Sequence, residues 1–131
     1  MILSSGQVEP FAYRVTVGKV VDGDTLDVDI DLGFSMQLMG QRLRLLRVNT
    51  PETKGKTREA GMQAKAFTRA WLGSHTNVMI RSRKREPGHA EKDAFGRWLV
   101  EVYGSDERGR QACLNDALLS SGNAVPFREG D

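Results

Sequence analysis

Apolar and polar residues alternate along the first part of the chain, as expected for β-strands that bury one face. The alternation runs from residue 11 to 21 and returns from 26 to 31, where aspartates occupy the polar positions. A period of two residues is typical of strands, so both segments predict strands. The dipeptide Asp22-Gly23 lies between them and predicts a hairpin turn.

The next segment, residues 32–41, has neither a clear strand period nor a helix period. Gly33 and Gly40 lie there among several apolar residues, so the segment is either a wide loop or the extended tip of a hairpin. The apolar residues at 43–48 then predict a third strand. This strand should end at Pro51, because proline lacks the N–H that a strand ladder needs.

The middle of the chain changes to a helical period. Residues 58–72 carry apolar side chains at spacings of four, three and four, namely Ala60, Ala64, Phe67 and Trp71. This spacing lines one face of a helix. Gly73 is the predicted end of that helix.

Two more strands and a short helix complete the predicted elements. Alternation at 77–83 and 98–103 predicts the strands, and a Pro-Gly pair makes residues 86–92 a loop between them. Apolar positions within 114–118 predict a short helix that ends at Gly122. Five strands, one longer helix and one short helix favour an all-β to α+β fold, a five-stranded β-barrel of the oligonucleotide-binding type.

The amino-acid composition limits the classes of protein to which the chain can belong. With 131 residues, 39% of them hydrophobic, the chain suits a single domain spanning residues 1–131, of which 1–10 are expected to form a flexible N-terminal segment. The net charge of +2 is too small to indicate nucleic-acid binding by itself. Cys113 is the only cysteine and there are two histidines, which argues against a disulfide or a thiolate zinc site. A metal here should be a hard, oxygen-bound cation.

The chain shows neither a secretory signal pattern nor an apolar run long enough to cross a bilayer. We therefore expect a cytoplasmic protein without a membrane partner. A monomer is the default expectation, and self-association through residues 34–40 is the alternative.

Carboxylate, carboxamide and backbone oxygens near the first turn and the third strand form a candidate metal site. Asp24 follows the hairpin turn, and Asn49 and Thr50 precede a proline that stiffens the strand exit. Calcium accepts these oxygen types, so Asp24, Asn49 and the Thr50 carbonyl are candidate ligands, with Asp22 acting through a water. For Asp24 alone, ordinary turn chemistry is the alternative explanation.

Charged residues beside these ligands suit cleavage of a phosphodiester. Glu52 is ionised at neutral pH and is a candidate general base for an attacking water. Arg44 and Arg97 are candidate phosphate ligands, since a guanidinium binds two oxygens and stabilises the added charge of the transition state. Arg44 stands inside the apolar run 43–46, where an unpaired charge is costly, so function or a nearby carboxylate must account for it.

Further residues are candidates for substrate binding. Lys54 and Lys56 follow Glu52, and a basic run contains Arg83 and Arg85. The run either follows a phosphate backbone or protects a sheet edge. Phe95 precedes a glycine turn and either stacks on a base or packs in the core.

Taken together, these motifs resemble the thermonuclease, or staphylococcal nuclease-like, family. The resemblance spans about residues 17–127 and rests on Asp-Gly-Asp-Thr at 22–25, Arg-Leu-Leu to Thr-Pro-Glu-Thr at 44–53, Phe-Gly-Arg at 95–97, and the segments 114–118 and 122–124. It implies a five-stranded barrel with helices and calcium-dependent hydrolysis of DNA and RNA that leaves 3′-phosphate and 5′-hydroxyl ends. Residue by residue, it implies calcium ligands at Asp24 and Thr50, a general base at Glu52 and phosphate-binding arginines at Arg44 and Arg97.

Several positions depart from the family pattern. Asn49 stands where the type member has a ligand aspartate, which predicts weaker metal binding because ligand charge tunes calcium affinity. Ala94 and Phe95 replace a lysine and a stacking tyrosine, and residues 34–40 form an insertion that caps the barrel, contacts a partner or pairs subunits. The leading hypothesis is a nuclease acting on DNA or RNA. The alternative, motivated by Asn49, is a weak or inactive barrel that binds nucleic acid or protein.

Overall fold

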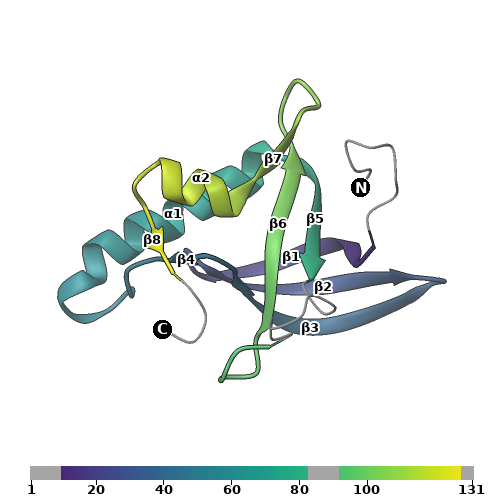
Figure 1. Cartoon of the computed structure of the whole chain (residues 1–131), viewed down its shortest axis with the longest axis horizontal. Helices are drawn as coiled ribbons and strands as arrows, with labels where there is room; N and C mark the ends of the chain where they lie inside the picture. Colours follow the sequence, from purple (N-terminus) through teal and green to yellow (C-terminus); the bar gives the residue numbers. More distant parts are fainter. Residues whose placement is uncertain (1–9, 83–91, 128–131) are drawn as a thin grey trace.

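Five strands close into a barrel in the computed structural model of the chain, which describes residues 10–82 and 92–127 (Figure 1). The strands are β1 (Ala12–Asp22), β2 (Thr25–Gly33), β3 (Met36–Leu45), β5 (Thr76–Ser82) and β6 (Trp98–Ser105). Antiparallel pairing gives the order β3-β2-β1-β5-β6, and a parallel pairing between β3 and β6 closes the ring. The predicted oligonucleotide-binding-type barrel is therefore confirmed.

Shorter elements surround the barrel. They are β4 (Val48–Asn49), which pairs with β8 (Val125–Pro126), β7 (Gln111–Cys113) on the edge of β6, the 3-10 turn η1 (Gly55–Thr57), and the helices α1 (Arg58–Ser74) and α2 (Leu114–Ser120). Figure 1 shows both helices on the same side of the molecule, away from the tip of the β2–β3 hairpin. None of the helices in the described part of the chain is long and apolar enough to cross a bilayer.

The barrel core consists of the inward-facing apolar residues of the strands. Leu26, Leu43, Leu45 and Val102 are completely buried there. Leu118 of α2 joins the same cluster, so burial of one helix face fixes α2 against the barrel.

The buried face of α1 differs in part from the prediction. Ala64 and Trp71 are buried as expected, but Ala60 is exposed and Gly61 is buried instead. A side-chain carbon on Gly61 would lie 2.2 Å from the carbonyl oxygen of Glu52, so glycine lets the helix contact that loop directly.

The predicted end of α1 at Gly73 is also wrong, since the helix continues through Ser74. His75 closes it: its Nδ1 lies 2.7 Å from the Trp71 carbonyl oxygen, and its ring stacks on the Trp71 indole with 3.8 Å between centroids. The His75 side chain thus binds the Trp71 carbonyl at the end of the helix. In many helices a glycine after the last turn lets backbone N–H groups bind such carbonyls instead.

Residues 32–41 form an extended hairpin rather than a wide loop. β2 and β3 continue to Gly33 and Met36, which pair across a tight turn. Phe34 and Ser35 occupy that turn with φ values of 54° and 61°. Positive φ at both central residues matches the twist of hairpin strands, which explains why the ladder continues to the tip.

The third predicted strand is not continuous over residues 43–48. β3 ends at Leu45, and Arg47 turns the chain with φ of 70° before β4 begins. The Leu46 N–H donates to the Val100 carbonyl at 2.8 Å, while the Phe127 N–H donates to the Arg47 carbonyl at 2.9 Å. These bonds end the barrel ladder and redirect the chain to β8.

Two sequence expectations lie outside the described residues. The segment 1–10 is described only at residue 10, and the loop 86–92 only at residue 92. The strand predicted for 77–83 is described through Ser82 as β5.

Candidate active site

Most of the residues predicted to carry chemistry line one open cleft of about 460 Å³ at the barrel mouth. The lining comes from the β1–β2 turn, the end of β3, β4 and the segment after it, the loop before β6, and the C-terminal segment. Its predicted members are Asp22, Asp24, Arg44, Asn49, Thr50, Glu52, Phe95 and Arg97, joined by Pro51, Asp93, Ala94 and Phe127. Residues as far apart in the sequence as Asp22 and Phe127 therefore face a common space.

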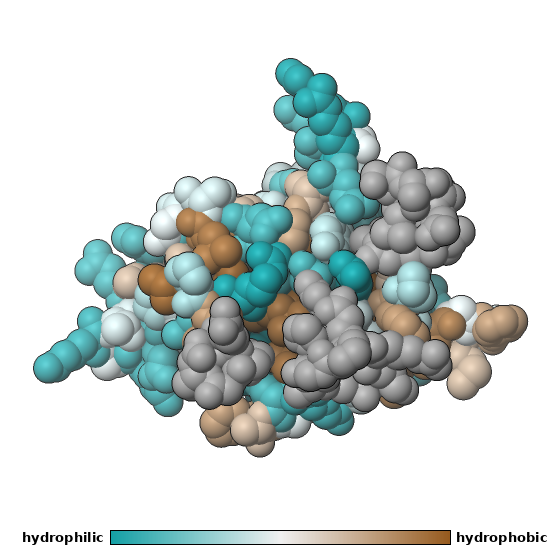
Figure 2. Space-filling view, in the orientation of Figure 1, coloured by the Kyte–Doolittle hydropathy of each residue, from teal (hydrophilic) through white to brown (hydrophobic). Residues whose placement is uncertain are grey.

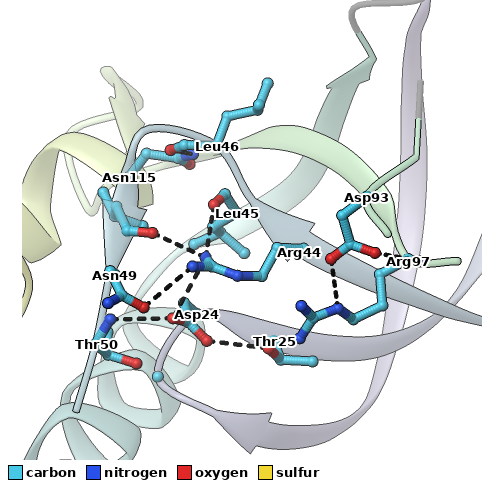
Figure 3. A network of polar contacts seen from close by, with 12 residues as sticks. Asp24, Thr25, Arg44, Leu45, Leu46, Asn49, Thr50, Asp93, Arg97 and Asn115 are labelled. Atoms are coloured by element: carbon cyan, nitrogen blue, oxygen red, sulfur yellow. Dashed lines mark hydrogen bonds and ion pairs between the residues drawn. The ribbon is translucent and has the colours of Figure 1, made fainter. Parts of the chain in front are cut away.

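Asp24 is the buried acid of the cleft and connects three chain segments (Figure 3). Its Oδ1 accepts a hydrogen bond from the Thr25 hydroxyl at 3.0 Å, and its Oδ2 accepts one from the Thr50 N–H at 3.0 Å. Oδ2 also lies 3.3 Å from Nη1 of Arg44. Ordinary turn chemistry does not account for these contacts, because two of the partners are distant in sequence.

The Arg44 guanidinium is held by the backbone around the β3–β4 turn. Nη1 donates to the carbonyl oxygens of Leu45 and Val48 at 2.9 and 2.8 Å, and Nη2 donates to Oδ1 of Asn49 at 3.3 Å. The Phe127 ring covers it, with its centroid 5.5 Å from Cζ. These contacts and the Asp24 carboxylate offset the free-energy cost of burying the Arg44 charge.

A residue that sequence reasoning left without a role, Asn115, supports this turn from behind. Its Nδ2 donates to the Leu46 carbonyl at 2.9 Å and to the Val100 carbonyl at 3.2 Å, while its Oδ1 accepts the Val102 N–H at 2.9 Å. Asn115 is completely buried. The charged Asp116 follows it at the start of α2, so the local sequence offered no distinct signal that Asn115 would be buried.

Arg97 is oriented by Asp93, a second residue to which the sequence gave no role. Oδ2 of Asp93 accepts Nε of Arg97 at 2.6 Å, and Oδ1 accepts the backbone N–H groups of Phe95 and Arg97 at 3.0 and 2.9 Å. Within the described part of the chain, both Nη groups of Arg97 remain without a hydrogen-bond partner. Asp93 therefore fixes the guanidinium through Nε and leaves its outer nitrogens for an anion.

The pKa of Asp93 reflects these contacts. Burial raises the pKa, but the hydrogen bonds from the Arg97 backbone and side chain and from the Phe95 backbone outweigh burial, so the net pKa is lowered. Asp93 is thus ionised at neutral pH. A carboxylate four residues before an arginine, with a glycine between them, is the sequence signal that identifies such a turn.

Glu52 projects from a loop that is held on both sides. The Thr57 hydroxyl donates to the Glu52 carbonyl at 2.8 Å, and Gly61 of α1 packs against the same carbonyl. On the other side, the Thr53 hydroxyl donates to Oδ1 of Asp22 at 3.1 Å. The Glu52 side chain is exposed and, among the described residues, has no ion-pair or hydrogen-bond partner. It is therefore able to accept a proton from water.

The oxygen donors around Asp24 fit a hard cation. Asp24, the Asn49 amide oxygen and the Thr50 carbonyl come from segments that meet in the cleft, and the Thr50 hydroxyl is buried without a hydrogen-bond partner in the described residues. Calcium accepts these ligand types together with water. No group of three or more acidic, histidine or cysteine side chains able to hold a metal occurs in the described ranges, and two of the three candidate donors, Asn49 and Thr50, offer neutral oxygens.

The remaining predicted substrate residues lie outside this inner cleft. Lys54 and Lys56 are exposed on the segment that follows Glu52 and do not line the cleft. Arg83 and Arg85 lie outside the described residues. Phe95 is 82% exposed at the cleft rim, with its ring centroid 5.3 Å from Cζ of Arg97, so a role in the core is wrong.

Fold and cleft together define the class, a small barrel of the oligonucleotide-binding architecture with a charged cleft at its mouth. Comparison with protein families then gives the particular family. Residues 42–130 match the family described as staphylococcal nuclease homologue, and the chain belongs to that family. The resemblance inferred from the motifs is confirmed. A comparison with curated proteins finds no significant match.

Proposed function

We propose that the protein is a calcium-dependent nuclease that hydrolyses phosphodiester bonds of DNA, RNA or both. The observation that carries the proposal is the convergence of Arg44, Arg97, Asp24 and Glu52 on one open cleft. Two cationic groups, a buried carboxylate and an exposed carboxylate are what charge-driven phosphodiester cleavage requires. Membership in a nuclease family supports the same reaction class.

Asp24, the Thr50 carbonyl and the Asn49 amide oxygen would hold the calcium ion, with Asp22 acting through water. The bound ion supplies Lewis acidity to a phosphate oxygen. Asn49 is neutral and its oxygen also accepts Nη2 of Arg44, so the protein offers the ion little negative charge. We therefore propose weaker calcium binding than an aspartate at residue 49 would give.

In the proposed reaction, Glu52 accepts a proton as a water oxygen attacks phosphorus. Arg44 and Arg97 donate hydrogen bonds to the phosphate oxygens, whose negative charge increases in the five-coordinate transition state. The new P–O bond forms while the bond to the leaving oxygen breaks and that oxygen gains a proton. By the family resemblance, the products carry 3′-phosphate and 5′-hydroxyl ends.

Cleavage of single-stranded DNA tests this proposal. We expect cleavage with calcium, its loss in a chelator, and a decrease of about 100-fold or more in Glu52→Gln, the scale of general-base catalysis. Glu59→Gln is the matched control, because Glu59 is an exposed glutamate at the start of α1 outside the cleft. Cleavage that persists in the chelator and in Glu52→Gln would reject the mechanism.

An alternative is that the barrel binds nucleic acid or protein with little chemistry. The observation that favours it is the neutral Asn49 beside Asp24, which lowers the charge available to a metal. This alternative predicts binding of single-stranded DNA without cleavage at any calcium concentration. The Glu52→Gln protein would then bind the DNA as the wild type does, and both would leave it intact.

A further inference from the structure

The β2–β3 hairpin extends past the barrel and carries an unusual concentration of exposed apolar side chains. Figure 1 shows the hairpin projecting beyond the other strands, and Figure 2 shows apolar atoms at that end of the molecule. The exposed members are Leu32, Phe34, Met36, Leu38 and Met39, here called the hairpin patch. Phe34 at the tip is 100% exposed and Met36 is 61% exposed. Grouped apolar exposure of this kind marks an interaction surface.

Register places part of the hairpin patch on the same face as the barrel core. Leu38 pairs with Ile30, which is buried, and directly paired residues share a face. Met36 lies two residues before Leu38 on the same strand and shares that face, while Gln37 points to the opposite one. The apolar inner face of the barrel therefore continues along the hairpin beyond the barrel rim.

The charges around the hairpin patch exclude an anionic partner. Residues 32–41 contain no ionisable side chain. The ionisable groups on the adjoining part of β2 are Asp29 and Asp31, whose carboxylates accept the N–H groups of Gly40 and Gly33 at 2.9 and 2.8 Å. A nucleic acid or an anionic membrane needs free cations at its contact surface. Residues 32–41 supply none, the adjoining Arg42 is ion-paired with Asp27 at 2.7 Å, and Arg14 lines a cavity together with Asp29 and Asp31. The hairpin patch therefore suits a neutral apolar protein surface.

The edge of β3 also lacks a strand partner at the hairpin. β3 pairs with β6 only through Leu43 to Leu45, so from Met36 to Gln41 its outer edge has no strand beside it among the described residues. Exposed edges are usually protected by lysine, proline or inward charges, and this segment has none of them. The unpaired edge of β3 and the apolar face beside it are therefore suited to contact with a strand of another molecule.

We propose that the hairpin patch associates with the hairpin patch of a second copy of this chain. A two-fold contact brings identical surfaces together, which is unfavourable for a charged patch and favourable for a neutral apolar one. The patch has five exposed apolar residues, against roughly 20–30 residues a side in a stable complex, so the dimer should be weak and depend on concentration. This proposal does not depend on the proposed nuclease activity.

Sedimentation equilibrium of the full chain tests it over a range of about 1 to 300 μM, where a dimer of micromolar affinity changes its population. We expect the average mass of the wild type to rise from monomer towards dimer across that range. Met36→Lys should weaken the dimer by about tenfold or more, since it places a desolvated charge on each side of the contact. Gln37→Lys is the matched control, because it adds the same charge to the opposite face of the same strand and should change the affinity by less than about threefold.

A thermal melt of each variant establishes that it is folded. A wild type that stays monomeric over the whole range would overturn the proposal. Equal dimer affinity in Met36→Lys and wild type would also overturn it, since the dimer would then use another face. Binding of the wild type to phosphatidylglycerol vesicles in place of self-association would count against it as well.

Discussion

The Arg44 guanidinium and the Asp24 carboxylate form a buried ion pair at the barrel mouth, with Nη1 3.3 Å from Oδ2 and side chains that are 7% and 9% exposed. The pair joins β3 to the β1–β2 turn, and Asp24 continues the connection to Thr50. Both residues belong to the proposed reaction, so the same contact supports the fold and positions the chemistry. It also makes the site sensitive to removal of either partner.

The first prediction concerns this pair. Asp24→Asn leaves Arg44 buried without its carboxylate and should lower the free energy of unfolding by about 3 kcal/mol. Urea unfolding in the presence of a chelator measures the loss apart from any metal effect. Asp27→Asn is the control: it breaks the more exposed Asp27–Arg42 pair and should cost less than about 1 kcal/mol. Equal losses in the two variants would contradict a special role for the buried pair.

Asn49→Asp tests whether the neutral side chain at residue 49 weakens calcium binding. We expect calcium affinity to rise by about tenfold, because one added carboxylate increases the ligand charge. Titration calorimetry measures this directly and does not require catalysis. Asn77→Asp adds the same charge outside the cleft, at a position with φ of 52° that aspartate also tolerates, and should leave the affinity unchanged. An unchanged affinity in Asn49→Asp would argue against residue 49 as a ligand position.

Asp93→Asn tests the positioning of Arg97. The amide cannot accept Nε and the two backbone N–H groups as strongly, so we expect cleavage to fall by about tenfold or more while calcium affinity is retained. Asp106→Asn is a matched control. Asp106 accepts the N–H groups of Arg108 and Arg110 in a turn of the same kind, outside the cleft. A similar loss of cleavage in both variants would indicate general destabilisation instead of positioning.

The lowered pKa of Asp93 also predicts a pH dependence of stability. Its folded pKa lies below the unfolded value of about 3.9, so the ionised group stabilises the fold above that pH. The contribution is lost as the pH falls through the folded pKa. The difference in unfolding free energy between wild type and Asp93→Asn should therefore shrink between about pH 5 and pH 2. A difference that stays constant over this interval would contradict the assignment.

Gly61→Ala tests the contact between α1 and the Glu52 loop. The added carbon would meet the Glu52 carbonyl at 2.2 Å, so the loop or the helix must move. We expect a loss of about 1 to 3 kcal/mol in stability together with reduced cleavage, because Glu52 is displaced. Gly73→Ala is the control in the same helix. Its added carbon meets nothing within 4 Å, and alanine favours helix, so it should be neutral or stabilising.

The sequence predicted the barrel because its strands carry their own signals. Alternating residues such as Val15 and Val17 identify a strand with one buried face, and Asp22-Gly23 identifies a hairpin turn, without knowledge of the partner strands. The candidate site residues were proposed on similar local grounds, since Arg44 in an apolar run and Glu52 after Pro51 stand out in the sequence. Family motifs supported the same residues.

Local sequence patterns did not predict the course of the backbone where contacts between residues distant in the sequence determine it. The break after Leu45 depends on the N–H of Leu46 binding Val100, and the end of α1 depends on His75 and Trp71. Ala60 and Gly61 fit a helix equally well. Only the approach of the Glu52 carbonyl makes the glycine the buried one.

The sequence by itself determined the approximate positions of the five barrel strands and the two helices, and the chemical types of the candidate site. Tertiary structure decided which polar groups are paired: Asp24 with Arg44 and Thr50, Asp93 with Arg97, and Asn115 behind the β3–β4 turn. The physical reason is that periodicity records burial along one element, whereas a hydrogen bond or an ion pair depends on the distance between atoms that folding brings together from separate segments.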